Sequence, residues 1–444
     1  IMFFDKFFTN YKLSKFNLDF FKNKRQSKNN KILVEFYEFA PTVIPFSYYA
    51  NALAEKYNAE INSYRVNFYN NSEKIKFYIK QILFNFRNLY KSFGCKKIIL
   101  PNTKVSEIEQ KYINKLIAKI KTKKNLLDLR FKNIPIGEYI YDEYLRSFGK
   151  ITIDVHSIHF KKYLNHTLKL SFFWFKKLNP KIIKSLIISH QAYLVGLVGI
   201  IAIYKNIPTY RVSLSSSFLL TKKNSKPFCD FKLYPKIIKK IDPNVKNFLL
   251  KKSEMKIVNY FTKKNLDHIK IKKRKKNKRL NVLISAHCFT DAVHIHGKDN
   301  CFYDFYEWID YLGKISNKIK NNWLVKLHPS EFDNNFNQIQ YFLKKYPNLK
   351  LLPKKTKNTS LINKIDIVLT VYGTVGREFP LFNIPVINAS TCGPHSGYNF
   401  NYHFKNKNEY NKAITNLKKY IKNFEKNRRE IFEFFYLRYN LDFS

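Results

Sequence analysis

The chain alternates short apolar segments of strand length with longer segments of helical spacing, and this alternation restricts the fold more than any other feature. In the first half, apolar runs separate stretches whose apolar residues recur with the helical period. The strand-like segments are 32–36, 96–101, 184–189 and 208–212, and the helical ones are 46–57, 74–93, 106–121 and 193–204. Such alternation predicts a mainly parallel sheet with helices on both faces.

A second series of the same kind follows a strongly basic stretch, Lys270–Arg279. Its strand-like segments are 280–286, 323–326, 365–370 and 385–388, and its helical ones are 304–320, 334–345, 376–382 and 409–433. Because 444 residues exceed one hydrophobic core, we predict an α/β fold of two Rossmann-like lobes with parallel sheets and a cleft between them. The predicted division is a basic aromatic arm over 1–30, lobes over 31–265 and 281–408, a basic linker over 266–280 and a C-terminal helix over 409–444.

The formal charge of +49 taken alone favours a polyanionic partner. Lys, Asn, Ile, Phe and Tyr are all abundant whereas Gly totals 11 and Met 2, so A/T-rich codons explain much of the lysine. The basic stretch has no aromatic residues interleaved for base stacking, so we expect no nucleic-acid partner. Polyanionic glycans and an anionic membrane surface stay open as partners.

Cysteine usage and the N-terminal residues bear on location. The five cysteines are scattered without a CxxC pair, which fits a reducing cytoplasm and no zinc site. The arm lacks the apolar core and cleavage site of a signal peptide. It resembles either an amphipathic segment lying on a membrane or a tail or helix packed on the domain. We therefore expect a cytoplasmic protein, with peripheral attachment at the inner face of the cytoplasmic membrane as an additional hypothesis.

Four polar residues lie close together after segment 280–286, namely His287, Asp291, His294 and His296. Ligands bind at the carboxyl edge of open α/β sheets, so this cluster predicts proton transfer or phosphate binding. Neither HExxH nor a cysteine pair is present, so no metal is expected. His294 or His296 could instead cap or pack.

Lys326 and His328 end the next strand-like segment and are followed by Pro329. Residues two apart on a strand face the same side, so the two cationic or hydrogen-bonding groups could meet one phosphate. Pro329 is expected to stop the strand and fix the turn.

A glycine-containing loop follows segment 365–370. Gly373 and Gly376 would let an anion approach the backbone N–H groups of a helix start, and Thr374 adds a hydroxyl. Glu378 could accept hydrogen bonds from ribose or sugar hydroxyls, or could be a charge favoured by the helix dipole.

The first lobe carries its own candidates. Glu138 and Asp142 are four residues apart and would share a helix face. His190 follows segment 184–189, where an acceptor-binding or catalytic base would lie, and a structural hydrogen-bonding role is the alternative.

The chain resembles the GT-B-fold glycosyltransferases of capsule and lipopolysaccharide biosynthesis in the stretches HCFTDAVHIHG, FYDFYEWI, WLVKLHP and TVYGTVGREFPLFNIPVI. Related His-Pro patterns occur in bacterial sialyltransferases, Kdo transferases and glycerophosphotransferases of wall polymers. The resemblance, which spans Asn281–Tyr402, implies that the C-terminal lobe holds a donor nucleotide and the N-terminal lobe the acceptor. It further implies that His328 contacts donor phosphate, and that Thr374 with its loop holds phosphate or ribose.

The expected activity is transfer of a sugar, of hexosyl or Kdo/sialyl type, from a nucleotide-sugar to a surface polysaccharide or lipid-linked glycan. No cofactor is expected beyond this substrate, and Asp291 is the preferred general base, with Glu138 second. The alternatives are a phospho-polyol (glycerophosphate) transferase, a non-catalytic polyanion-binding protein and a UDP-sugar epimerase of the same fold.

Overall fold

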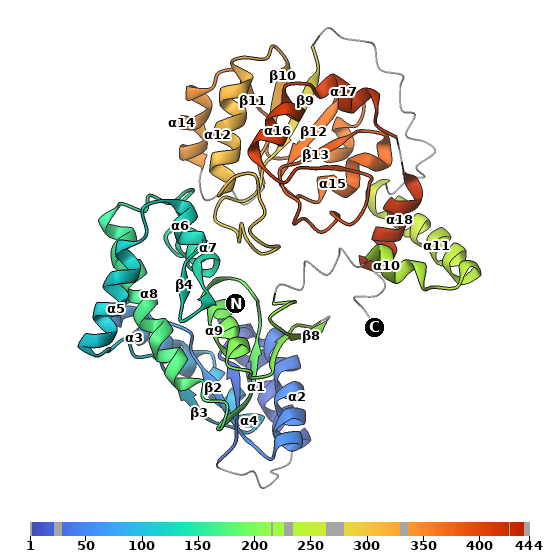
Figure 1. Cartoon of the computed structure of the whole chain (residues 1–444). Coiled ribbons are helices and arrows are strands. Elements are labelled where there is room, and N and C mark those ends of the chain that lie inside the picture. Colours follow the sequence, from blue (N-terminus) through green and yellow to red (C-terminus); the bar gives the residue numbers. More distant parts are fainter. Residues whose placement is uncertain are drawn as a thin grey trace. The chain divides into compact units, whose positions relative to one another are not determined.

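The computed structural model describes residues 2–21, 29–214, 216–225, 234–262, 279–328, 336–425 and 427–438. It contains two compact units (Figure 1). Unit 1 comprises Ile1–Tyr144 and Ile153–Ser225, and unit 2 comprises Leu145–Thr152 and Lys226–Ser444. The division between the units thus falls earlier than the predicted 265, and most of the predicted basic linker lies outside the described residues.

Unit 1 is built on a six-stranded sheet of order β3-β2-β1-β6-β7-β8. Its strands are β1 Lys31–Glu35, β2 Glu60–Tyr64, β3 Cys95–Ile99, β6 Ile183–Ile188, β7 Thr209–Val212 and β8 Ser217–Leu220. All neighbours pair in parallel except β7 and β8. The chain order of these six strands, 3-2-1-4-5-6, is that of the Rossmann fold.

Helices surround this sheet: α1 Met2–Phe20, α2 Ala40–Tyr57, α3 Asn71–Leu83, α4 Phe86–Ser92, α5 Glu107–Ala118, α6 Lys123–Leu127, α7 Gly137–Phe148, α8 Ile158–Lys177 and α9 Tyr193–Tyr204. A two-stranded antiparallel ribbon, β4 Arg130–Phe131 and β5 Ile134–Pro135, precedes α7. The predicted single helix over 74–93 is wrong, because Asn85 takes a left-handed conformation that separates α3 from α4.

Unit 2 repeats the same topology with every pair parallel, in the order β11-β10-β9-β12-β13-β14. Its strands are β9 Asn281–Ser285, β10 Asn322–Lys326, β11 Leu349–Leu351, β12 Ile367–Thr370, β13 Val386–Asn388 and β14 Tyr402–His403. The predicted α/β class with two Rossmann-like sheets is therefore confirmed, and the cleft between the lobes stays a prediction.

The helices of unit 2 are α10 Tyr234–Lys239, α11 Pro243–Thr262, α12 Phe305–Ser316, α14 Phe336–Lys345, α15 Val375–Glu378, α16 Lys407–Ile414, α17 Leu417–Lys422 and α18 Arg428–Tyr436, with the 3-10 turns η3 Asn358–Leu361 and η4 Phe379–Phe382. Helices α12 and α14 lie side by side (Figure 1), joined by the Tyr346 hydroxyl, which donates to Asp310 at 2.7 Å.

The predicted long C-terminal helix is three short helices. The Asn406 side chain caps α16, and Thr415 at its end turns its hydroxyl back to the carbonyl of Asn411. Asn427 caps α18 by accepting from the backbone of Glu430. Asn and Thr compete with helical hydrogen bonds through their own side chains, so they end helices more readily than they continue them.

Helix α18 packs against α10 and α11, and the Lys246 ammonium lies 3.1 Å from the Glu433 carboxylate. This packing explains why 234–262 belongs to unit 2 rather than to the predicted first lobe. Within the described residues, no helix combines the length and apolar character needed to cross a bilayer.

Candidate functional site

A pocket of about 470 Å³ opens at the carboxyl edge of the sheet of unit 2. Its walls come from the segments that follow β9, β10 and β12, which are neighbours in the sheet. The crossover connections reverse direction between β9 and β12, and ligands of open α/β sheets bind at such a point. Seven residues named from the sequence line this pocket: His287, Asp291, His296, Lys326, His328, Gly373 and Thr374.

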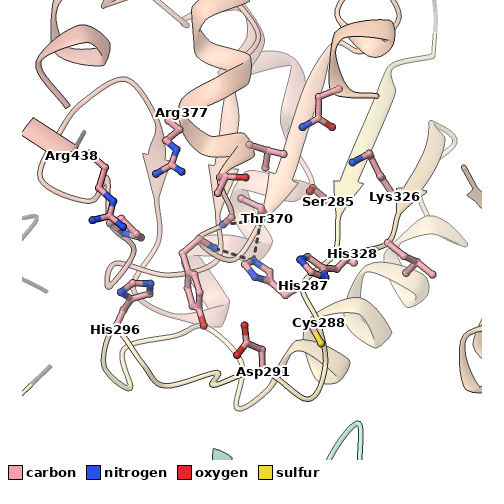
Figure 2. Close-up of a pocket in the computed structure, with 18 residues that line it drawn as sticks. Ser285, His287, Cys288, Asp291, His296, Lys326, His328, Thr370, Arg377 and Arg438 are labelled. Carbon is pink, nitrogen blue, oxygen red and sulfur yellow. Dashed lines mark hydrogen bonds between the residues drawn. The ribbon is translucent and has the colours of Figure 1, made fainter. Parts of the chain in front are cut away.

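Permanent cations dominate the pocket wall. Lys326, Arg377 and Arg438 line it (Figure 2), whereas Asp291 supplies the only carboxylate among the described lining residues. The guanidinium of Arg377 lies over the ring of Phe434, 5.8 Å from its centroid. A wall with this excess of positive charge suits a phosphate or diphosphate group.

Sequence reasoning missed both arginines. Arg377 sits inside the quoted stretch TVYGTVGREFP, between two residues that were singled out, so its position was a usable signal. Arg438 follows α18 and lies at the pocket because that helix packs against α10, α11 and η4 of the same unit. No local pattern could have indicated it.

Lys326 ends β10 and is half-buried. Burial lowers the pKa of its ammonium group, and the carboxylate of Glu378 opposes that shift. Glu378 itself accepts a hydrogen bond from the amide of Asn358, a lining residue. Glu378 is not among the lining residues, so the structure places it behind the wall, next to Lys326 and Asn358.

His287 follows β9 and lines the pocket next to the end of β12. Its ring stacks on Phe305 with centroids 4.4 Å apart, and its Nε2 accepts the backbone N–H of Tyr372 at 3.3 Å. The same Nε2 lies 3.1 Å from the hydroxyl oxygen of Thr370 (Figure 2). Burial lowers the pKa of His287 to about 3, so the imidazole is neutral at physiological pH and holds the loop after β12.

Asp291 and His328 are the exposed titratable groups of the pocket. The Asp291 carboxylate accepts the backbone N–H of Ala292 at 2.8 Å, which fixes its orientation. The hydroxyl of Tyr372 donates to the carbonyl of Val293 at 2.8 Å and so ties the Asp291 loop to the loop after β12. An accessible carboxylate facing a cationic wall can accept a proton while an anion is bound opposite.

The glycine loop differs from expectation. Helix α15 has only four residues and continues into η4. The N–H of Gly373 donates to Thr370 Oγ1, and the N–H of Gly376 donates to the carbonyl of Gly373. A Cβ at Gly376 would lie 2.4 Å from Nε2 of His395, so this glycine permits close packing. These two amides are therefore not directed at an anion, and Thr374 is the exposed group of the loop.

Two further predicted residues, His294 and Gly376, are not among the residues that line the pocket. His294 is buried, and His296 rather than His294 lines the pocket, with its ring edge-on to Tyr372 at 4.8 Å. Gly376 packs against His395. Pro329 lies outside the described residues.

Glu138 and His190 belong to unit 1 and form no part of this pocket. Glu138 is half-buried in the first turn of α7. Nδ1 of His190 accepts the backbone N–H of Ala192 at 3.0 Å, and its ring lies against Tyr193. His190 therefore shapes the turn between β6 and α9.

Sequence reasoning also missed Glu35, the last residue of β1, because the whole segment was interpreted as a buried strand. Its carboxylate accepts the backbone N–H of Ser189 at 2.6 Å. Burial raises the pKa of Glu35 to about 7. Glu35 thus links the ends of β1 and β6, the strands at which unit 1 changes direction.

Within the described ranges, no three His, Cys, Asp or Glu side chains are grouped so that they could hold a metal ion.

No protein-family model matches the chain, and no curated protein matches it. Solved structures similar to it include a UDP-GlcNAc 2-epimerase of Methanocaldococcus jannaschii in complex with UDP-GlcNAc and UDP, at 14% identity over 90% of this chain and 96% of that one, with a TM-score of 0.27. A glycosyltransferase from Rickettsia africae ESF-5 is 10% identical over 94% of this chain and 97% of that one, with a TM-score of 0.29. The wall teichoic acid polymerase TagF is 9% identical over 98% and 92%, with a TM-score of 0.25.

Proposed function

We propose that the chain is a glycosyltransferase whose unit 2 binds the diphosphate of a nucleotide-sugar in the pocket after β9, β10 and β12. One observation carries the proposal: Lys326, Arg377 and Arg438 converge at the switch point of a Rossmann-ordered sheet. A pocket of about 470 Å³ has the size of a small-molecule site.

The cations act on the leaving group. When the acceptor hydroxyl oxygen bonds to the anomeric carbon, the bond from that carbon to the diphosphate oxygen breaks, and the electron pair leaves with the nucleoside diphosphate. Lys326, Arg377 and Arg438 stabilise the charge that develops there, without a cofactor.

Asp291 accepts the proton of the acceptor hydroxyl. Its carboxylate is exposed, lines the same pocket as the cations and is held by the N–H of Ala292. Glu138 of unit 1 is the second candidate for this role. The acceptor, a surface polysaccharide or lipid-linked glycan, and a cytoplasmic location follow from the resemblance and the composition and complete the proposal.

Nucleotide-dependent thermal stabilisation tests the binding step. UDP, CDP, CMP and GDP are compared with the corresponding nucleosides, because stabilisation grows with ligand concentration over Kd and the preferred base should stand out. We expect a diphosphate to raise Tm and its nucleoside to leave it unchanged.

Lys326→Gln should weaken nucleotide binding by about 1–3 kcal/mol, as the loss of a charged hydrogen bond does. Lys350→Gln is the matched control, because Lys350 is an exposed lysine of β11 outside the pocket. Equal stabilisation of both variants and the parent protein would place the nucleotide elsewhere and contradict the proposal.

A further inference from the structure

Helix α3 presents an apolar stripe to solvent. Ile75, Tyr78, Ile79 and Ile82 recur with helical spacing, and with Leu83 they are 45% to 73% exposed. The opposite side of the helix is buried at Phe77. Large apolar side chains gathered on one exposed helix face mark an interaction surface, whereas scattered ones need no explanation.

Helix α1 buries several polar residues and exposes several large apolar ones. It buries Asn10, Ser14 and Asn17 against the body of unit 1, and Asn17 donates to the Ser92 hydroxyl oxygen of α4 at 3.2 Å. Its exposed large apolar residues are Phe8, Tyr11, Phe16, Leu18 and Phe20. Of the described side chains of α1, only Leu13 packs on the core of unit 1, so most of its large apolar side chains are exposed next to lysines, which suits an anionic surface over an apolar interior.

The two helices adjoin at Phe84, which follows α3. The amide of Asn10 donates to the carbonyl of Phe84 at 2.6 Å, and the ammonium of Lys6 lies 4.8 Å from the centroid of the Phe84 ring. Both helices also contact α4. The exposed stripe of α3 and the first half of α1 therefore belong to one region of unit 1, called here the α1–α3 face.

A groove of about 340 Å³ borders this face, between α3, α4 and the edge strand β3. Arg87, Lys91, Lys96 and Lys97 line it, and no described lining residue is acidic. No ion pair is formed by these four cations within the described part of the chain. Excess positive charge next to an exposed apolar stripe fits a surface that is itself anionic over an apolar interior.

Gln81 adds an independent observation. It lines the groove and is 5% exposed, yet its Nε2 has no hydrogen-bond acceptor among the described residues. A buried amide donor without an acceptor is costly unless a ligand supplies one. A phosphate oxygen placed in the groove would accept from Gln81 and from the surrounding cations.

We propose that the α1–α3 face docks on an anionic phospholipid bilayer, with the groove holding a lipid phosphate and the stripe of α3 entering the interfacial layer. This inference concerns unit 1 alone and does not rest on the nucleotide pocket. It adds α3 and β3 to the contact, whereas the sequence pointed to the N-terminal arm alone, which contains α1.

Vesicle flotation of the full chain tests the proposal. We expect binding to vesicles with about 30% phosphatidylglycerol, little binding to phosphatidylcholine alone, and partial release as salt rises, because lysines near the surface are attracted over a Debye length. Equal binding to both vesicle types would overturn the role of the groove.

Paired variants locate the contact. Ile79→Ser with Ile82→Ser should weaken vesicle binding on the order of tenfold or more, because less apolar surface enters the interface. Ile108→Ser with Ile158→Ser is the matched control, since these isoleucines are 80% and 74% exposed on α5 and at the start of α8. Unchanged binding of the α3 variant, or equal loss in the control, contradicts the proposal.

Charge variants and two further measurements complete the design. Lys96→Gln with Lys97→Gln should remove most of the preference for anionic vesicles, while Lys350→Gln should keep it. Circular dichroism and Tm check that the exposed substitutions leave the fold intact, and nucleotide stabilisation should be unaffected in all of them. If sedimentation shows a dimer that the α3 variant dissociates, and vesicles are not bound, the face joins two copies and the membrane proposal is wrong.

Discussion

The two units share one strand order but have different side chains at the point where that order reverses. In unit 1, the carboxylate of Glu35 at the end of β1 binds the backbone of Ser189 after β6. In unit 2, the neutral imidazole of His287 after β9 meets Thr370 at the end of β12. In unit 1 the carboxyl group takes up the backbone N–H after β6, whereas in unit 2 the neutral ring lines a pocket with three cationic side chains that suit a phosphate. The comparison therefore teaches that topology supplies the position and that side-chain charge decides what it can bind.

The largest expected effect is the acid sensitivity of unit 2. The pKa of His287 is lowered from 6.5 to about 3, so between these pH values the imidazole binds a proton in the unfolded chain but not in the folded unit. The contribution of His287 to the free energy of unfolding is fully present above pH 6.5 and is lost as pH falls toward 3, by up to about 4 kcal/mol. His287→Gln should flatten this dependence. The measurement is the urea midpoint against pH in a Trp174→Phe background, where Trp308 and Trp323 report on unit 2.

For this first prediction, His156→Gln serves as the control, because His156 is exposed in unit 1. Acid sensitivity that persists in His287→Gln would assign it to other groups and remove the neutral imidazole from the comparison.

Unit 1 should show the opposite sign. Burial raises the pKa of Glu35 from 4.5 to about 7, so the folded unit holds a proton that the unfolded chain releases. Stability then falls as pH rises from 4.5 to 7, by about 3 kcal/mol in total. Glu35→Gln should be more stable than the parent protein at pH 8, as monitored through Trp174 after Trp308→Phe and Trp323→Phe.

The control for the second prediction is Glu107→Gln, an exposed carboxylate in the first turn of α5. A destabilised Glu35→Gln protein at pH 8 would mean that the ionised carboxylate is needed by the bond to Ser189.

Apolar periodicity located four strands of each six-stranded sheet, because the period of apolar residues is local, but it missed β2, β8, β11 and β14. It located His287, Asp291, Lys326, His328, Gly373 and Thr374 at one pocket, because residues after parallel strands meet at the same edge. Arg438 was beyond its reach, since the position of Arg438 depends on how α18 packs on α10 and α11.

Residues whose role depends on distant contacts, or on local breaks in helices, were also missed in the sequence. Glu35 ends an apolar strand, and its importance comes from Ser189, which is far away in sequence. The break at Asn85 and the three-part C-terminal region were missed because apolar periodicity carries little information on left-handed residues and caps.

The third prediction separates chemistry from binding. Asp291→Asn keeps nearly the same shape but accepts no proton, so turnover should fall about 10²-fold or more while nucleotide affinity survives. Sugar-transfer kinetics and nucleotide stabilisation are measured on the same preparation. Glu138→Gln is the companion variant in unit 1, and a loss of turnover there with normal Asp291→Asn activity would move the base to unit 1.

The smallest expected effect concerns the histidines that follow the sheets of the two units. His328 is exposed in the pocket wall after β10, whereas His190 after β6 is engaged by the backbone of Ala192. His328→Ala should weaken nucleotide binding about tenfold, which corresponds to one hydrogen bond to a charged group. His190→Ala should leave the affinity unchanged, because the cations proposed to bind phosphate lie in unit 2. Isothermal titration of both variants with the preferred nucleotide measures the difference. Equal losses would show that unit 1 also contributes to the nucleotide site, and the assignment of phosphate binding to unit 2 alone would then be wrong.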